Sequence, residues 1–235
     1  MEERMHLVHS ACALGVSAAL VLTLCAAPQA AFASELADSP DAHLGALSAS
    51  AGESSAPFSD VSDGEWYAQI VDRAYTLGLL TGYEGTDLFG PSDGMTRGQM
   101  VVVLKRLFDN ADFSGAPYWG SHADELRLDF PSGNETGFTD VSDGEYYTAA
   151  INWAMHYHIV SGYDGTDKFG PNDPLTREQC AKMIASWLGF YGYDPSASYP
   201  DWDRSDEVFL AYSDAGDISL WARNAVLTAR QNGCM

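Results

Sequence analysis

Two arginines stand at the predicted starts of helices, in the segments Thr96-Arg-Gly-Gln99 and Thr176-Arg-Glu-Gln179. In each segment the threonine and the glutamine three residues later form a capping-box pattern, which predicts that the helix begins at the arginine. A cation in the first turn opposes the helix macrodipole, which favours negative charge there. Together with free backbone N–H groups, the guanidinium of Arg97 or Arg177 could instead bind an anion, and its two-pronged geometry suits a carboxylate. The alternative is that each arginine pairs with a nearby Asp or Glu.

Three further kinds of side chain recur with these arginines and could line the same site. The acids could contact a ligand, or cap a turn through their own backbone. The aromatic residues before the first predicted helix could stack on a ligand or pack in the core. The tyrosines follow a glycine in a loop, a position suited to ligand contact. The pairs are Asp60 and Asp140, Trp66 and Tyr146, and Tyr83 and Tyr163.

All of these residues belong to an internal repeat with an offset of 80 residues. Phe58-Ser-Asp-Val-Ser-Asp-Gly-Glu65 matches Phe138-Thr-Asp-Val-Ser-Asp-Gly-Glu145, and the register holds without a gap through Phe108 and Leu188. A partial third copy begins at Tyr212-Ser-Asp214. A repeat of this kind indicates a supersecondary unit that buries its apolar face against its neighbours.

Each repeat is predicted to fold as helix, loop and helix. The boxes Ser62-x-x-Glu65 and Ser142-x-x-Glu145 predict where the first helix begins. The loop from Thr81 to Gly94 is rich in Gly and Asp, and Pro91 prevents a helix from running through it. Apolar residues at helical spacing predict the buried face of the second helix. They are Met100, Val103, Leu104 and Leu107 in one copy and Cys180, Met183, Ile184 and Trp187 in the other. The predicted fold class is therefore all-α.

The order of these motifs resembles the S-layer homology repeat: Phe-x-Asp-Val, an aromatic residue that opens a helix, Gly-Tyr-x-Gly, Phe-x-Pro, and Thr-Arg at a second helix. The resemblance covers nearly all of the chain from Phe58 onward. It implies tandem repeats, usually three, packed as a pseudo-threefold helical prism that is incomplete here. It also implies that grooves between repeats bind secondary cell-wall polysaccharide, often pyruvylated, with Arg97 and Arg177 at the family's ligand-binding position. The final Glu of the family's Thr-Arg motif is Gln in both copies.

The function implied by the resemblance is non-covalent anchoring of a secreted protein to the bacterial cell wall, without enzymatic activity, metal or cofactor. The wall polysaccharide is the expected partner, and self-association or contact with S-layer neighbours is left open. One alternative is a calcium-binding surface module, because Glu84, Asp87 and Asp93 and their copies lie in Gly-rich loops, although the spacing does not fit an EF-hand. Another alternative is a wall-degrading hydrolase, since carboxylates are plentiful and paired acids can cleave glycosides; the repeats would then be the anchoring part of a longer cell-wall hydrolase.

The composition excludes other partners. With 33 acidic and 12 basic residues the formal net charge is −21, so the chain lacks the basic field that nucleic acids require and is repelled by anionic membranes. An apolar run from Ala11 to Ala27, followed by Ala31-Phe-Ala33, predicts a cleaved secretory signal. The two cysteines of the mature chain, Cys180 and Cys234, are too few for a disulfide framework. We expect a secreted protein at the cell wall, with no membrane contact after signal cleavage.

The predicted organisation has seven segments, and the candidate ligand-binding residues all lie in the first two repeats. The segments are a signal peptide (1–33), a flexible leader (34–57), a first repeat (58–109), a connecting loop (110–137), a second repeat (138–190), a second connecting loop (191–211) and a partial third repeat (212–235).

Overall fold

The computed structural model describes residues 57–111, 128–191, 212–231 and 234 of the chain. The predicted signal peptide, nearly all of the leader and much of both connecting loops lie outside these ranges. The described part is helical, and its one β pairing is an isolated bridge between Thr96 and Pro174. The predicted all-α fold class is thus confirmed. None of the described helices combines the length and the apolar character needed to cross a bilayer.

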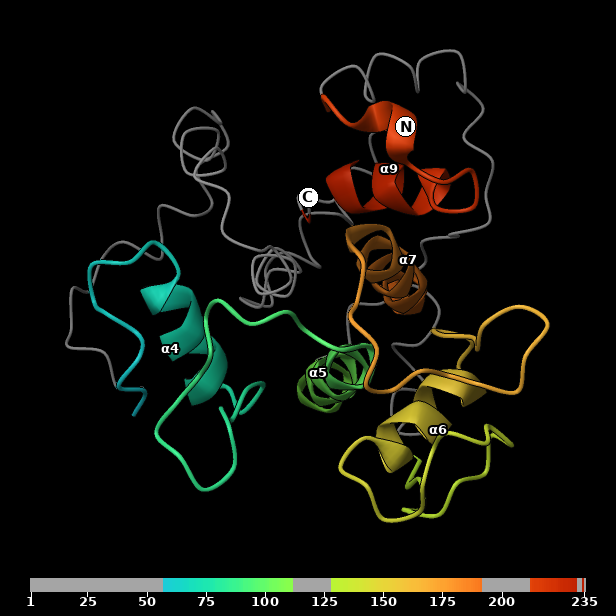
Figure 1. Ribbon diagram of the computed structural model, residues 1–235, viewed down its shortest axis with the longest axis horizontal. Coiled ribbons are helices and arrows are strands. Elements are labelled where there is room, and N and C mark those ends of the chain that lie inside the picture. Colours follow the sequence, from blue (N-terminus) through green and yellow to red (C-terminus); the bar gives the residue numbers. More distant parts are fainter. Residues whose placement is uncertain (1–56, 112–127, 192–211, 232–233, 235) are drawn as a thin grey trace. The chain divides into compact units, whose positions relative to one another are not determined.

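The chain divides into two compact units between Gly94 and Met95. The smaller unit, described from residue 57, contains helix α4 (Ala68–Thr76) and the loop that follows it. The division falls inside the first predicted repeat, between its loop and its second helix. The elements of the larger unit are α5 (Arg97–Asn110), α6 (Thr148–His156), α7 (Arg177–Leu188) and α9 (Arg223–Gln231), with the short 3-10 helices η3 (Gly189–Tyr191) and η4 (Ala215–Asp217) (Figure 1).

The smaller unit is organised around the buried ring of Phe58. This ring meets Tyr75 of α4 edge-on at 5.3 Å and Phe89 of the loop at 5.4 Å between ring centroids. Gly82 lies directly against the same ring with a φ of +66°, and a Cβ at this position would collide with Phe58. The loop can therefore close on the ring only because a glycine occupies this position.

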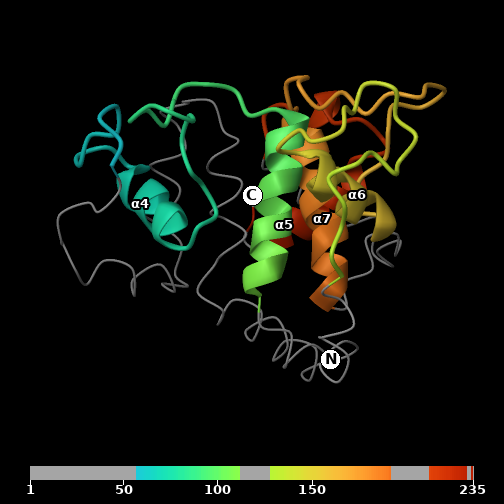
Figure 2. The same cartoon turned by 90° about the horizontal axis from the view of Figure 1, so that it is seen from below.

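The larger unit is held together by helix pairs that cross the repeat boundaries. α5 packs against α6 and α7, and α7 packs against α9 (Figures 1 and 2). An aromatic cluster joins them, since the ring of Phe108 on α5 lies 5.3 Å from Trp153 on α6 and 4.9 Å from Phe190 in η3. The predicted buried faces of the second helices are confirmed, because all eight apolar residues named for them are buried.

The helix caps predicted from local patterns are half right. The capping boxes at Thr96 and Thr176 are both present, with the threonine side chain bonded to the backbone of the glutamine three residues later. The boxes predicted at Ser62 and Ser142 are wrong, because α4 begins at Ala68 and α6 at Thr148, and neither has a side-chain cap. In the second repeat the reason is a glycine inside the box, Gly144, whose φ of +78° is incompatible with a helix.

The helix α9 starts with the same backbone hydrogen bond as α4 and α6. In α4 and α6 the first helical bonds run from Val71 N to Tyr67 O at 2.9 Å and from Ile151 N to Tyr147 O at 2.8 Å. The bond from Val226 N to Ala222 O, also 2.9 Å, takes the same place relative to Trp221. The extent of this third copy remains a prediction.

Candidate ligand-binding site

The aspartate near the start of each repeat anchors the loop of that repeat. The two carboxylate oxygens of Asp60 accept hydrogen bonds from Phe89 N and Gly90 N, both at 2.8 Å. Asp140 makes the equivalent pair in the second repeat, at 2.9 and 2.8 Å. Partial burial raises the pKa of Asp60, but the backbone hydrogen bonds outweigh it and hold that pKa below its ordinary value. The carboxylates thus bind the backbone of a loop 29 and 30 residues away.

The loop tyrosines are bound to an acid within their own loop. Tyr83 donates its hydroxyl to Asp93 at 2.6 Å, and Tyr163 donates to Asp173 at 2.9 Å. The bond to Asp93 is the main reason why the pKa of Tyr83 is raised, and burial is the main reason for Tyr163. The Tyr83 ring is exposed, whereas that of Tyr163 is half-buried.

Arg97 is buried against the loop of the second repeat. Its guanidinium lies 4.7 Å from the ring centroids of both Tyr163 and Phe169. Its Nε donates to Phe169 O at 2.9 Å, and a terminal nitrogen donates to Ser161 O at 3.1 Å. Only 5% of the residue is exposed. Burial lowers the pKa of Arg97, and the nearby Tyr163, Asp173 and Asp140 offset part of that shift.

The first-turn N–H groups of α5 are also occupied. Arg97 N donates to Asp173 O at 3.0 Å, and Gly98 N donates to Pro171 O at 2.9 Å. Gln99 N donates to the hydroxyl of Thr96 at 3.2 Å. An anion at this helix start would have to displace these contacts. The Arg97 side chain contacts carbonyl oxygens and aromatic rings, and its role toward a ligand remains a prediction.

Arg177 lies in different surroundings. It is exposed at the start of α7, next to Thr176, which is also exposed and caps the helix. The structure therefore does not place Arg97 and Arg177 in equivalent environments, although their sequence motifs match. That Arg177 contacts an anion remains a prediction.

The aromatic residues before the first helices are exposed, and the alternative that they pack in the core is wrong. Trp66 is 46% exposed and Tyr146 is 59% exposed, and Trp221 in the third copy is 52% exposed. The ring of Tyr146 meets Tyr147 edge-on at 5.0 Å, and Tyr147 is the buried member of the pair. An exposed ring held at its edge leaves its face available for stacking on a sugar.

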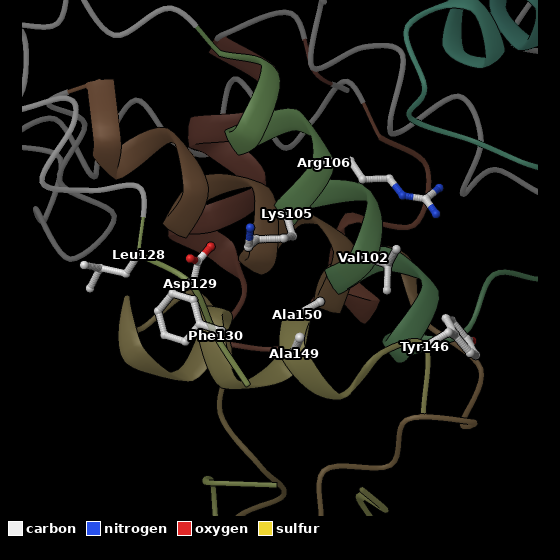
Figure 3. A pocket seen from close by; sticks show the side chains of 9 residues that line it. All are labelled: Val102, Lys105, Arg106, Leu128, Asp129, Phe130, Tyr146, Ala149 and Ala150. Carbon is white, nitrogen blue, oxygen red and sulfur yellow. The ribbon is translucent and has the colours of Figure 1, made fainter. Parts of the chain in front are cut away.

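A pocket of about 290 Å³ opens between α5, α6 and residues 128–130 (Figure 3). Tyr146 stands at one end of it and Leu128 at the other. Lys105 and Arg106 line it from α5, and Lys105 is also ion-paired with Asp109 at 2.7 Å. The remaining lining residues are Val102, Asp129, Phe130, Ala149 and Ala150.

Among the residues of this pocket, only Tyr146 is predicted from the sequence as a ligand contact. A signal for the others was present, because Lys105-Arg106 is a pair of adjacent bases in a chain of net charge −21. Residues 128–130 carried no signal, since they belong to the connecting loop and reach the pocket only through the fold. The other predicted residues fall into two groups. The smaller unit contains Asp60, Trp66 and Tyr83. The contact between the start of α5 and the loop of the second repeat involves Arg97, Asp140 and Tyr163.

The acidic loops do not form a recognisable metal site in the part of the chain that the structure describes. No group of three or more Asp, Glu, His or Cys side chains there has a metal-binding arrangement. Asp93 and Asp173 are engaged by the tyrosine hydroxyls instead. The calcium alternative gains no support from the geometry.

Comparisons with known proteins agree with the repeat analysis. The model of the S-layer homology domain matches residues 57–101 and 137–181. The chain is 28% identical to a cell surface protein of Thermoanaerobacter kivui, a match covering 70% of this chain and 20% of that protein. It is 30% identical to an endoglucanase of Bacillus sp. (strain KSM-635) and 24% identical to the exoglucanase XynX of Acetivibrio thermocellus, covering 74% and 76% of this chain but 15% and 14% of those enzymes.

The chain thus spans a fifth or less of the length of these relatives. No solved structure matches it. The domain that the family model describes is a binding and anchoring module, without catalytic function of its own. Two S-layer homology repeats thus occupy residues 57–101 and 137–181, and each contains the helix, the loop and the start of the second helix expected of it.

Proposed function

We propose that the repeats anchor the protein that carries them to the bacterial cell surface by binding anionic cell-wall polysaccharide without a covalent bond. The S-layer homology repeats and the similarity to a cell surface protein support the location. The observation that carries the polysaccharide part is the pocket between α5 and α6, which brings the exposed Tyr146 ring together with Lys105 and Arg106.

The lining of this pocket has the chemistry that an acidic sugar requires. The ring of Tyr146 offers an apolar surface for the C–H face of a pyranose at one end of the pocket, and the Phe130 ring lies toward the opposite end. Lys105 and Arg106 offer donors to hydroxyl and carboxylate oxygens. The Lys105–Asp109 pair is partly exposed and contributes roughly 0–1 kcal/mol, so that a ligand carboxylate can compete with Asp109. The volume of about 290 Å³ lies near the lower end of the roughly 300–1,000 Å³ range of small-molecule sites.

Arg177 extends the proposal to a substituent such as a pyruvyl ketal. Arg177 is an exposed residue at the start of a capped helix, where a carboxylate gains from both the guanidinium and the helix macrodipole. Tyr83 and Trp66 in the smaller unit present exposed rings for further sugar contacts. We therefore propose that Arg177 contacts the pyruvyl carboxylate if the polymer is pyruvylated, whereas sugar binding in the pocket does not require pyruvylation.

The test is co-sedimentation of the protein with purified cell-wall sacculi. We expect Tyr146→Ala and the double variant Lys105→Gln/Arg106→Gln each to weaken binding at least about tenfold, because a lost stacking or charged contact of about 1.4 kcal/mol corresponds to that factor. Lys182→Gln, which removes an exposed charge from α7, is the matched control and should bind as the parent does. If the pocket variants bind like the control, the pocket is not the polysaccharide site.

A second candidate is that the repeats form the anchoring part of a longer polysaccharide hydrolase. Two relatives are named as an endoglucanase and an exoglucanase, and the matched region covers 15% and 14% of them. The purified chain is expected to release no reducing ends from cellulose or cell-wall glycans, because any such activity would belong to other parts of a longer protein. Release by this chain alone would contradict the assignment of the repeats to binding.

A further inference from the structure

The loop of the first repeat, residues 81–94, has the same internal geometry as the loop that holds Arg97. Tyr83 N donates to Leu88 O at 2.9 Å, and the equivalent bond 80 residues later is also 2.9 Å. Asp93 N donates to Gly90 O at 2.9 Å, against 3.1 Å in the second loop. The tyrosine, phenylalanine and aspartate that surround the guanidinium of Arg97 all recur here as Tyr83, Phe89 and Asp93.

The two loops differ in how open their rings are. In the second loop Phe169 is fully buried and Tyr163 half-buried, with the guanidinium of Arg97 stacked on both. In the first loop Tyr83 is 44% exposed and Phe89 is half-buried. The first loop therefore presents at the surface the same pair of rings that the second loop uses to hold an arginine.

The charge of the smaller unit also favours a cation. Residues 57–94 contain seven acidic residues and one basic residue, Arg73. A guanidinium that approaches this loop is attracted by the surrounding carboxylates before contact, and it gains cation–π and carbonyl contacts once it is in place.

We propose that the loop 81–94 is a docking site for the start of α7 in a second copy of this chain, with Arg177 as the inserted side chain. The motif that fills the second loop is a capped helix start with the sequence Thr-Arg-x-Gln, and α7 carries the same motif with the same capping box. Thr176 and Arg177 are both exposed. The contact joins different surfaces of the two molecules, so that copies add head to tail into rings or open chains.

One difference between the two helix starts limits the strength of this contact. A Cβ on Gly98 would lie 2.8 Å from Pro171 O, and α7 has Glu178 at the equivalent position. Docking of α7 therefore requires the backbone around the Pro91 carbonyl to move away from the Cβ of Glu178, which costs part of the binding free energy. Glu178 also accepts hydrogen bonds from Ser219 N at 3.0 Å and from the Ser219 hydroxyl at 3.2 Å. We expect an association weaker than the contact of Arg97 within the chain, and reversible on dilution.

The experiment is sedimentation velocity over a concentration series, without any wall polymer. The parent chain should form species larger than a monomer as the concentration rises. Arg177→Gln and Tyr83→Ala should each be monomeric throughout, because each removes one side of the contact. An equimolar mixture of these two variants should form a dimer and nothing larger, since only one productive pairing remains. Lys182→Gln, on the same helix, should associate as the parent does.

Three results would overturn the proposal: a parent chain that stays monomeric over the whole series, association of Arg177→Gln equal to that of the parent, or a variant mixture that stays monomeric. Circular dichroism checks that Tyr83→Ala is folded, and if it is not, the exposed substitution Arg177→Gln decides the matter against the parent. Because no polysaccharide is present, a negative result leaves the anchoring function untouched. A failure of wall binding would in turn leave this contact untouched.

Discussion

Replacement of Arg97 by alanine tests whether this side chain holds the larger unit together. The substitution removes two hydrogen bonds from a charged donor, worth about 1.5–3 kcal/mol each, and stacking on two rings, worth about 1–2 kcal/mol. Desolvation of the guanidinium, which is also what lowers the Arg97 pKa, offsets part of this gain. We expect Arg97→Ala to lower the free energy of unfolding by about 3 kcal/mol. Arg177→Ala, at an exposed position, should change it by less than about 0.5 kcal/mol.

Guanidinium chloride unfolding followed by tryptophan fluorescence measures this difference, because Trp153 and Trp187 are buried in the larger unit and report its unfolding. The midpoint of Arg97→Ala should fall well below that of Arg177→Ala, with similar slopes. Equal midpoints for the two variants would refute the structural role of Arg97. If Arg97→Ala is strongly destabilised, its loss of wall binding cannot identify a ligand contact, and the binding test therefore uses the pocket residues.

Three further predictions follow from the charges and the core. Because the pKa of Asp60 is lowered in the folded chain, its bonds to Phe89 and Gly90 stabilise the fold above the unfolded pKa of about 3.9. This stability is lost as pH falls through the lower pKa that Asp60 has in the folded chain. Asp60→Asn should therefore lower the free energy of unfolding at pH 7 but leave it equal to that of the parent at the lowest pH of an acid titration. A difference in free energy of unfolding that stays constant with pH would contradict this. Phe108→Ala should cost about 3–5 kcal/mol by chemical unfolding, since it empties the cluster with Trp153, and a cost below about 1 kcal/mol would show that the cluster does not hold the helices. Affinity for sacculi should rise as salt increases from low to physiological levels, because screening shortens the repulsion between a −21 chain and an anionic polymer from about 30 Å to about 8 Å; a steep fall would contradict this.

The fold could be predicted from the sequence where the signal is local or periodic. The boxes at Thr96 and Thr176 and the apolar faces of α5 and α7 depend on residues three or four positions apart, and these predictions are confirmed. The same pattern failed at Ser142 because Gly144 takes a left-handed conformation, which a motif of two residues does not capture. Trp66 and Tyr146 fit the spacing of the apolar residues in α4 and α6, but they precede these helices. Their rings are therefore exposed and do not pack with the buried face of the helix.

The candidate site depends on contacts that sequence spacing does not encode. The hydrogen-bond acceptors of the Arg97 side chain lie 64 and 72 residues away in the sequence. The Thr-Arg motif does not indicate that the guanidinium donates to backbone carbonyl groups rather than to a ligand. Tyr146 could be found because its copy Trp66 marks the position. Asp129 and Phe130 reach the pocket from a connecting segment that follows no repeat. The motif thus identified the family, whereas the pocket required the packing of α5 on α6.

The most direct test of anchoring compares the fraction of mature protein that sediments with sacculi before and after the sacculi are stripped of their secondary polysaccharide. We expect most of the protein to sediment with intact sacculi and to remain in the supernatant with stripped peptidoglycan. Equal sedimentation with both preparations would contradict the proposal that a wall polysaccharide is what these repeats bind.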